Sequence, residues 1–104
     1  MELAKKLERD PELFLVATLR KEIVAAVMGA FDGRRGHVYH LAVAPGARRQ
    51  RIAEALMAEL ETRFRALGCI RMNLLVTGDN PEAEPFWQHL GWRKMNVSAW
   101  GKDL

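Results

Sequence analysis

Cysteine and histidine are scarce in this sequence, and their spacing does not fit a metal site. Cys69 is the only cysteine among 104 residues, so a disulfide within the chain is excluded. The three histidines are scattered, and together with Cys69 they lack the spacing of zinc ligands. We therefore predict no metal site. We interpret Cys69, which begins an apolar stretch, as a buried structural thiol rather than a nucleophile.

Long hydrophobic runs and several familiar motifs are also missing. No apolar stretch approaches the roughly 20 residues of a membrane-spanning helix. The first residues, MELAKK, are charged and do not form a signal-peptide pattern. The sequence has neither the G-x-S-x-G motif of serine hydrolases nor a Walker phosphate loop. These absences argue against a membrane association and against both enzyme classes, and they favour a cytoplasmic location.

The composition is that of an ordinary globular domain. Hydrophobic residues make up 49% of the chain and charged residues 28%, so we predict one domain over residues 1–104. The net charge of +3 is mild and suits an anionic ligand. Because acidic residues are interspersed with the basic ones, this charge does not by itself argue for nucleic acid.

The pattern of apolar residues and turn signals predicts an α/β domain with a mixed sheet, in the order α-β-β-β-α-β-α-β. The strand after the long helix should run parallel to the strand before it, because a helix crossover joins them. Asp32 and Gly33 mark a turn, and Gly68 and Gly91 are placed to end helices. The predicted elements are a helix at 2–9, strands at 12–19, 23–31 and 37–43, a helix at 49–67, a strand at 69–76, a helix at 84–90 and a strand region at 92–101.

The long helix at 49–67 has one apolar face at helical spacing, with charged residues on the other faces. This face predicts how the helix packs on the sheet. Its members are Ile52, Ala55, Leu56, Leu60, Phe64 and Leu67.

The most informative stretch is LAVAPGARRQRIA at residues 41–53, which predicts a strand, a short Pro-Gly loop and the start of the long helix. Arg48, Arg49 and Arg51 stand where the unpaired N–H groups of a helix already carry partial positive charge. Three guanidinium groups there are unfavourable unless an anion lies among them. The stretch therefore predicts a phosphate or pyrophosphate site, and the alternative is a solvated basic turn without a ligand.

Three motifs, in order and at matching intervals, resemble the GNAT superfamily of N-acetyltransferases. The first is the strand LAV at 41–43 followed by RRQRIA at 48–53, which is similar to the pyrophosphate motif [Q/R]-x-x-G-x-[G/A]. The second is Asp79-Asn80 after the next strand. The third is FWQHLGW at 86–92, which is similar to F-Y-x-x-L-G-[F/Y]. The resemblance covers residues 12–104 and implies a GNAT-like mixed sheet flanked by helices, without the first strand and helix of the usual fold.

The resemblance implies an acetyl-CoA-dependent N-acetyltransferase that acts on a primary amine of a small molecule or peptide. The pantetheine arm would lie between strands 41–43 and 73–76 like an added strand, and the helix N-terminus would take the pyrophosphate. A backbone N–H near Leu41 or Val43 would stabilise the oxyanion. The implied acetyl-CoA-binding residues are Leu41, Ala42, Val43, Arg48, Arg49, Gln50, Arg51, Ile52, Ala53, Asn80, Phe86 and Trp87.

The catalytic residues are less well defined by the resemblance. His40 and Asn80 are the catalytic candidates, and the alternatives for a general base are His37, Asp79 and Glu84. Direct attack by an amine that is already neutral would need little help from a base.

The sequence departs from the family pattern at three places. Arg51 stands where the motif has glycine, so its guanidinium adds a phosphate contact or its stem crowds the site. Trp87 stands where many relatives have the tyrosine that protonates the leaving thiolate, and an indole is not a practical acid. The short N-terminal part would leave the strand at 12–19 as a bare apolar edge, which predicts a second subunit and hence a homodimer.

These departures keep two other functions open. One is a degenerate, non-catalytic acyl-CoA-binding or oligomerisation module, motivated by Arg51, by Trp87 and by the missing N-terminal wall of the acceptor site. The weaker one is a nucleic-acid contact through the arginines, which aromatic residues do not accompany. The arginines that would make it are Arg34, Arg35, Arg48, Arg49 and Arg51.

Overall fold

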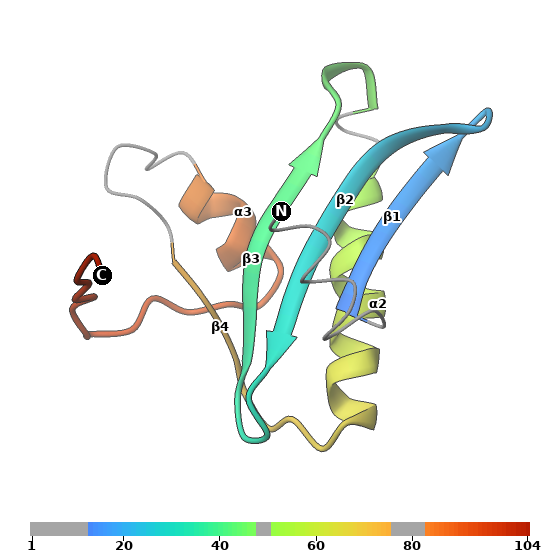
Figure 1. The fold of residues 1–104 in the computed structure, drawn as a ribbon. Coiled ribbons are helices and arrows are strands. Elements are labelled where there is room, and N and C mark those ends of the chain that lie inside the picture. The colour runs from blue at the N-terminus through green and yellow to red at the C-terminus, as the bar shows by residue number, and fades with distance from the viewer. Residues whose placement is uncertain (1–12, 48–50, 76–82) are drawn as a thin grey trace.

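The computed structural model describes residues 13–47, 51–75 and 83–104 (Figure 1). The helix predicted at 2–9 lies outside these ranges. Four strands form one sheet, one long helix lies on a face of it, and a shorter helix follows the fourth strand. The elements are β1 Phe14–Leu19, β2 Glu22–Phe31, β3 Gly36–Val43, a 3₁₀ turn Pro45–Ala47, α2 Ile52–Ala66, β4 Met72–Leu74 and α3 Glu84–His89.

The sheet has the order β1-β2-β3-β4, with antiparallel pairing among the first three strands. β4 runs parallel to β3, as the crossover through α2 predicts. Arg20 and Lys21 form the β1–β2 turn with φ of 52° and 68°, the left-handed pair that suits a two-residue hairpin. The mixed sheet with flanking helices confirms the predicted fold class.

The core lies between the sheet and α2. Leu60 and Phe64 of α2 are fully buried, and they pack over Val27 of β2 and Val38 of β3. Two members of the predicted helix face are wrong: Ala55 is exposed and Leu67 caps the helix with 40% of its surface exposed. Met57, absent from that prediction, is buried instead. The face of the helix that packs on the sheet is therefore narrower than the spacing of apolar residues predicts, and it is rotated slightly toward Met57.

Both helices end with the same glycine cap. At the end of α2, Gly68 has φ of 85° and its N–H donates to Arg65, while the N–H of Cys69 donates to Phe64. Gly91 and Trp92 make the equivalent bonds at the end of α3. In such a cap, a left-handed glycine lets two N–H groups satisfy the last carbonyls of the helix. The predicted roles of the two glycines are confirmed.

The cap explains why β4 is shorter than the strand predicted at 69–76. The N–H of Cys69 is bonded to the helix, and the Cys69 thiol donates to the carbonyl of Arg71 at 3.1 Å, so this stretch turns before it can pair. Cys69 is half-buried, not fully buried. Pairing with β3 begins at Met72, and Val76 lies outside the described ranges.

The strand region predicted at 92–101 is wrong. These residues are described, and they form neither a strand nor a helix. Trp92 packs on the core, but Val97 and Trp100 are 75% and 94% exposed. A strand needs a partner for its backbone groups, and these residues do not pair with β4, the last strand of the described sheet. None of the described helices is long and apolar enough to cross a membrane.

Asp32 fixes the turn between β2 and β3. Its carboxylate accepts hydrogen bonds from the N–H groups of Arg34 and Arg35 at 2.8 and 2.7 Å. The bond from Arg35, then that from Arg34, with a smaller contribution from His37, holds the pKa of Asp32 below its ordinary value of 3.8. A lowered pKa in the folded state stabilises the fold above the unfolded-state pKa, and this contribution is lost as the pH falls through the folded-state pKa.

We therefore expect Asp32→Asn to lower the melting temperature at pH 7, because the amide replaces a charged acceptor. The difference from the parent protein should stay constant down to about pH 5 and shrink below about pH 4, where the parent carboxylate is protonated too. Thermal unfolding followed by circular dichroism between pH 7 and pH 3 measures it, with the exposed Asp103→Asn as the control. A difference that does not change with pH would contradict this role of the carboxylate.

Candidate functional site

The strands β3 and β4 separate halfway along β3. They pair only through Gly36–Val38 and Met72–Leu74, whereas β3 continues to Val43. Figure 1 shows β4 leaving β3 as the two strands run upward. From Tyr39 to Ala42, the edge of β3 that faces β4 is therefore not paired with any strand of the described ranges. We call residues 39–42 of this edge the open edge of β3.

A β-bulge at Tyr39 changes which backbone groups reach this edge. His40 pairs with Met28 and Val38 with Gly29, so Tyr39 is the additional residue. Before the bulge, even-numbered residues point toward β4, as the bond from the N–H of Gly36 to Arg71 at 2.9 Å shows. After the bulge, even-numbered residues point toward β2.

The direction of the backbone after the bulge follows from the hydrogen bond that the N–H of Ala44 donates to the carbonyl of Val24, at 2.7 Å. Backbone direction alternates along a strand, so Leu41 lies in a pair that exchanges no hydrogen bonds with β2. Its N–H and C=O therefore point to the open edge. The bulge was not predicted, although the sequence carries a signal of it: the core-facing residues are Val38 before the bulge and Leu41 and Val43 after it.

The helix α2 begins beside the carboxyl end of β3. The 3₁₀ turn Pro45–Ala47 follows the strand, and Ile52 and Ala53 form the first turn of the helix, both half-buried. Arg48, Arg49 and Gln50, three of the predicted phosphate-binding residues, lie outside the described ranges. Arg51 caps the helix with φ 59° and ψ 19°, and its exposed side chain makes no capping bond.

Arg51 thus holds a left-handed conformation that glycine adopts without strain. The family motif therefore has two reasons for glycine at this position: the left-handed backbone conformation and the close approach of a ligand. We expect Arg51→Gly to raise the free energy of unfolding by about 1 kcal/mol, because it relieves the clash of Cβ with the backbone. Urea unfolding measures it. Arg51→Ala, which keeps Cβ, is the control, and an equal gain in both variants would contradict strain at this residue.

The structure describes the backbone of one catalytic candidate and leaves the other outside the described ranges. His40 lies in β3, next to Leu41 and opposite Met28, and its side chain is outside the described part. Asp79 and Asn80 lie outside the described ranges. The alternative bases have partners elsewhere: His37 is 3.7 Å from Asp32, and Glu84 is 3.8 Å from Lys94.

The aromatic residues of the third motif form a packed cluster on α3. Trp87 is half-buried, with its ring 4.9 Å from that of Phe86 and 5.4 Å from that of Trp92, both edge to face. Trp87 and Trp92 are the two residues that the glycine cap of the helix brings into contact. Trp87 is therefore a packing residue of this cluster. In the described ranges, no three metal-ligating side chains gather where they could hold an ion.

Comparison with known proteins gives the family. Residues 2–92 match the profile of the Acetyltransferase (GNAT) family. An acetyltransferase of Sodalis glossinidius is 43% identical over 105 residues, which cover 100% of this chain and 74% of that protein. An acetyltransferase of Pectobacterium atrosepticum is 40% identical over 104 residues, with the same coverage. The chain therefore belongs to the GNAT family of acetyltransferases, as the three motifs predict.

Solved structures agree with this assignment. Ard1 from Thermoplasma volcanium is 26% identical, with a TM-score of 0.79 over 86% of this chain and 61% of that chain. The aminoglycoside N-acetyltransferase AAC(6')-Iy in complex with CoA is 15% identical, with a TM-score of 0.82 over 98% of this chain and 73% of that chain. The second likeness shows the fold alone.

Proposed function

We propose that the protein transfers an acetyl group from acetyl-CoA to a primary amine of a small molecule or peptide. The observation that carries this proposal is the open edge of β3, where the bulge at Tyr39 turns the N–H and C=O of Leu41 away from β2. A polar backbone edge can hydrogen-bond an extended ligand as it would a further strand. The pantetheine arm of acetyl-CoA, with its two amides, is such a ligand.

Each part of acetyl-CoA has a place in this proposal. The pyrophosphate lies at the N-terminus of α2, where N–H groups and the motif arginines supply positive charge. The thioester lies against Leu41, whose N–H stabilises the oxyanion that forms when the amine attacks. The C–N bond forms first, with the carbonyl π electrons moving onto oxygen. When this intermediate collapses, the C–S bond breaks, and the CoA thiolate takes a proton from water, because the indole of Trp87 cannot supply one. His40, one residue from Leu41, is the base proposed to receive the amine proton.

A non-catalytic acyl-CoA-binding protein is the second candidate function. Two observations favour it: the conformation of Arg51 is strained at the motif glycine, and Trp87 is packed between two aromatic rings where relatives have an acid. Neither observation removes the open edge of β3, so this candidate also predicts binding of acetyl-CoA. The two functions differ only in turnover.

Titration calorimetry with acetyl-CoA, followed by a thiol-release assay across a panel of primary amines, tests both candidates. Saturable binding with thiol release supports the enzyme, and binding without release on any amine supports the non-catalytic protein. Arg51→Gly and Arg51→Ala are measured in parallel. Weaker binding in both variants means that the guanidinium contacts a phosphate, whereas tighter binding in the glycine variant alone means that Cβ and the strained backbone oppose the ligand. The absence of binding in all three proteins would contradict the proposal.

We also propose that the protein forms a homodimer. In the described sheet β1 is an edge strand that pairs only with β2, and its Val16 and Leu19 are 44% and 43% exposed. An apolar edge of this kind is a template for pairing with another chain. Light scattering at micromolar concentration tests this, and a monomer would contradict it.

A further inference from the structure

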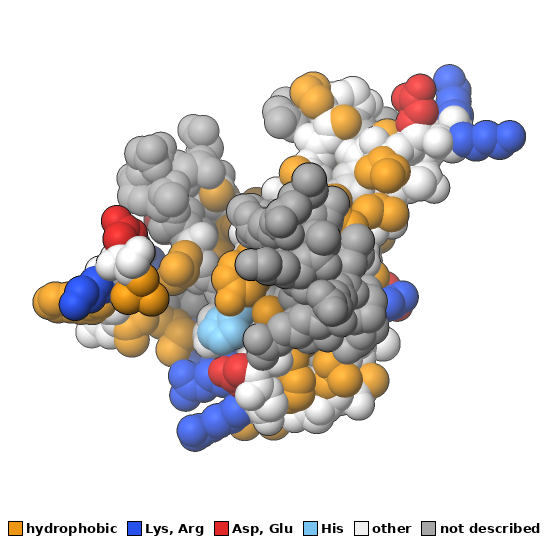
Figure 2. Space-filling view, viewed as in Figure 1, with side chains coloured by type: hydrophobic (Ala, Val, Ile, Leu, Met, Phe, Trp, Pro, Cys, Tyr) orange, Lys and Arg blue, Asp and Glu red, His pale blue; other side chains and the backbone are white. Residues whose placement is uncertain are grey.

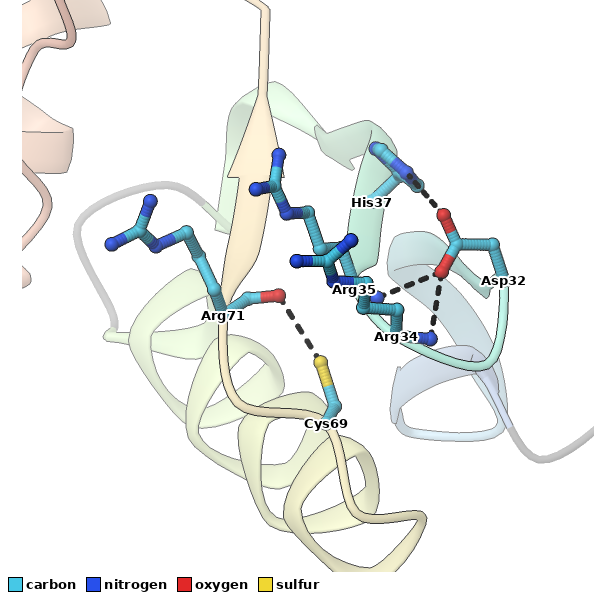
Figure 3. A network of polar contacts seen from close by, with 6 residues as sticks. All are labelled: Asp32, Arg34, Arg35, His37, Cys69 and Arg71. Carbon is cyan, nitrogen blue, oxygen red and sulfur yellow. Dashed lines mark hydrogen bonds and ion pairs between the residues drawn. The ribbon is translucent and has the colours of Figure 1, made fainter.

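Three arginines lie together at the end of the sheet remote from the N-terminus of α2. Arg34 and Arg35 belong to the β2–β3 turn, and Arg71 precedes β4. The bond from the N–H of Gly36 to the carbonyl of Arg71, at 2.9 Å, holds the two segments side by side. Figure 3 shows the three guanidinium groups on one side of the turn. We call these three residues the basic cluster. The eight residues of β3 separate it from the proposed pyrophosphate site.

The carboxylates around the basic cluster are engaged by other groups. One oxygen of Asp32 accepts the backbone N–H groups of the turn, and the other lies 3.7 Å from His37. On α2, Glu59 pairs with Arg63 at 3.0 Å and Glu61 pairs with Arg65. Within the described ranges no ion pair includes a member of the basic cluster. The turn and the residue before β4 therefore present three exposed cations that no carboxylate of the described ranges pairs with, which creates a local positive potential.

A groove and an unpaired strand edge adjoin the basic cluster. The residues that line this groove include Arg71, Met72 and Asn73 at β4 and Trp92, Arg93 and Met95 after α3. Glu61 of α2 also lines it, with its carboxylate paired to Arg65. β4 is hydrogen-bonded to β3 alone among the described strands, so no strand of the described ranges pairs with its second edge. An extended chain laid along β4 would have backbone partners on the strand and would meet Arg71 and Arg93 of the groove lining.

We propose that the basic cluster and the adjoining edge of β4 form a docking surface for an extended acidic polypeptide segment. Guanidinium groups bind carboxylates with charge-assisted, often bidentate hydrogen bonds, and the strand edge supplies the backbone contacts that such a segment needs. The C-terminal residues of a second copy suit the surface less well, because Arg93, Lys94 and Lys102 would bring like charge. This surface lies apart from the proposed acetyl-CoA site and does not depend on it.

A nucleic acid is the less favoured partner. Proteins that bind single strands combine positive charge with exposed aromatic rings for stacking. The ring pair nearest the turn, His37 and Tyr39 with centroids 6.2 Å apart, belongs to β3 itself. Figure 3 shows His37 on the opposite side of the turn from the guanidinium groups. Trp92 lines the groove beside Arg71, but it is half-buried and its ring packs edge to face on Trp87, 5.4 Å away, instead of standing free for stacking.

The chain offers a matched control for the experiment. The tip of the β1–β2 hairpin also carries two adjacent cations, Arg20 and Lys21, and Figure 2 shows basic side chains at both of these ends of the molecule. Two double variants therefore remove the same charge at different turns. One combines Arg34→Gln with Arg35→Gln, and the other combines Arg20→Gln with Lys21→Gln. All four side chains are exposed, and unchanged melting curves show that the variants are folded.

The measurement is fluorescence anisotropy of a labelled hexaglutamate peptide at low salt, with labelled oligothymidylate and hexalysine as comparison probes. We expect saturable binding of hexaglutamate. Arg34→Gln with Arg35→Gln, and separately Arg71→Gln, should weaken it by about fivefold. The Arg20 and Lys21 variant should change it less than about twofold. Three results would overturn the proposal. An equal loss of hexaglutamate affinity in the variants of both turns would mean that only net charge matters. Tighter binding of the oligonucleotide would mean a nucleic-acid surface, and no saturable binding of hexaglutamate would mean that the docking surface does not exist. Acetyl-CoA binding should be the same in all variants, whether it is present or absent in the parent protein.

Discussion

Replacing Gly36 with alanine should destabilise the protein by about 2 kcal/mol, because the core has no room for a methyl group there. A Cβ built on Gly36 would lie 2.7 Å from one ring carbon of Phe64 and 2.9 Å from two others. Phe64 is 1% exposed, so its ring cannot move into solvent. Urea unfolding followed by circular dichroism measures the change. Gly101→Ala, where an added Cβ meets nothing within 4 Å, should change stability by less than about 0.5 kcal/mol.

A smaller residue in place of Phe64 provides the test of this cause. Phe64→Leu alone should cost about 1–3 kcal/mol for lost packing, but it should also make room for the methyl group of Gly36→Ala. The double variant should therefore be more stable than the sum of the single changes indicates, with a coupling of about 0.5–2 kcal/mol. Additive losses would mean that contact with Phe64 does not cause the effect of Gly36→Ala.

The contact between Gly36 and Phe64 also shows which features of the fold a sequence pattern can predict and which it cannot. The strands β1, β2 and β3 and the helix α2 could be predicted, because each has an apolar rhythm or turn signals of its own. The need for glycine at Gly36 and Gly29 could not, since it arises from the position of the Phe64 ring after the helix has docked. Burial of Met57 instead of Leu67 has the same origin, because docking rotates the apolar face of α2.

The failures in the second half of the chain have a different cause. Residues 94–99 alternate polar and apolar side chains, but their backbone does not pair with the second edge of β4, and without such pairing an alternating segment is not a strand. Cys69 looks like a strand residue and serves the helix cap instead. In both cases the backbone hydrogen bonds, which a residue pattern does not show, decide the structure.

The candidate site was predicted in outline and not in its decisive detail. The motif residues identified the strand 41–43 and the start of α2, and β3 does extend beyond its pairing with β4. The bulge at Tyr39 was not predicted, although it determines that Leu41, and not its neighbour Ala42, turns its N–H toward the open edge. The shift of core-facing residues from Val38 to Leu41 is the pattern that such a bulge leaves in a sequence.

This direction of the Leu41 N–H leads to the largest expected effect on function. In the proposed mechanism Leu41→Pro removes the donor that meets the oxyanion, so kcat should fall about 10²–10³-fold, and acetyl-CoA should bind more weakly. The fold should persist, because proline is tolerated in a strand where its missing N–H would point to an unpaired edge. Thiol release with an accepted amine measures kcat, and calorimetry measures binding.

Two controls isolate the N–H from other consequences of this substitution. Leu41→Ala removes a similar amount of core packing and keeps the N–H, so its kcat should stay within about fivefold of the parent. Ala42→Pro removes an N–H that points toward β2 and should destabilise the fold by about 3 kcal/mol. If Leu41→Pro and Leu41→Ala lower kcat equally, the side chain and not the N–H matters. If Ala42→Pro is as stable as Leu41→Pro, the register after the bulge differs from the one in this structure, and the oxyanion must meet another donor.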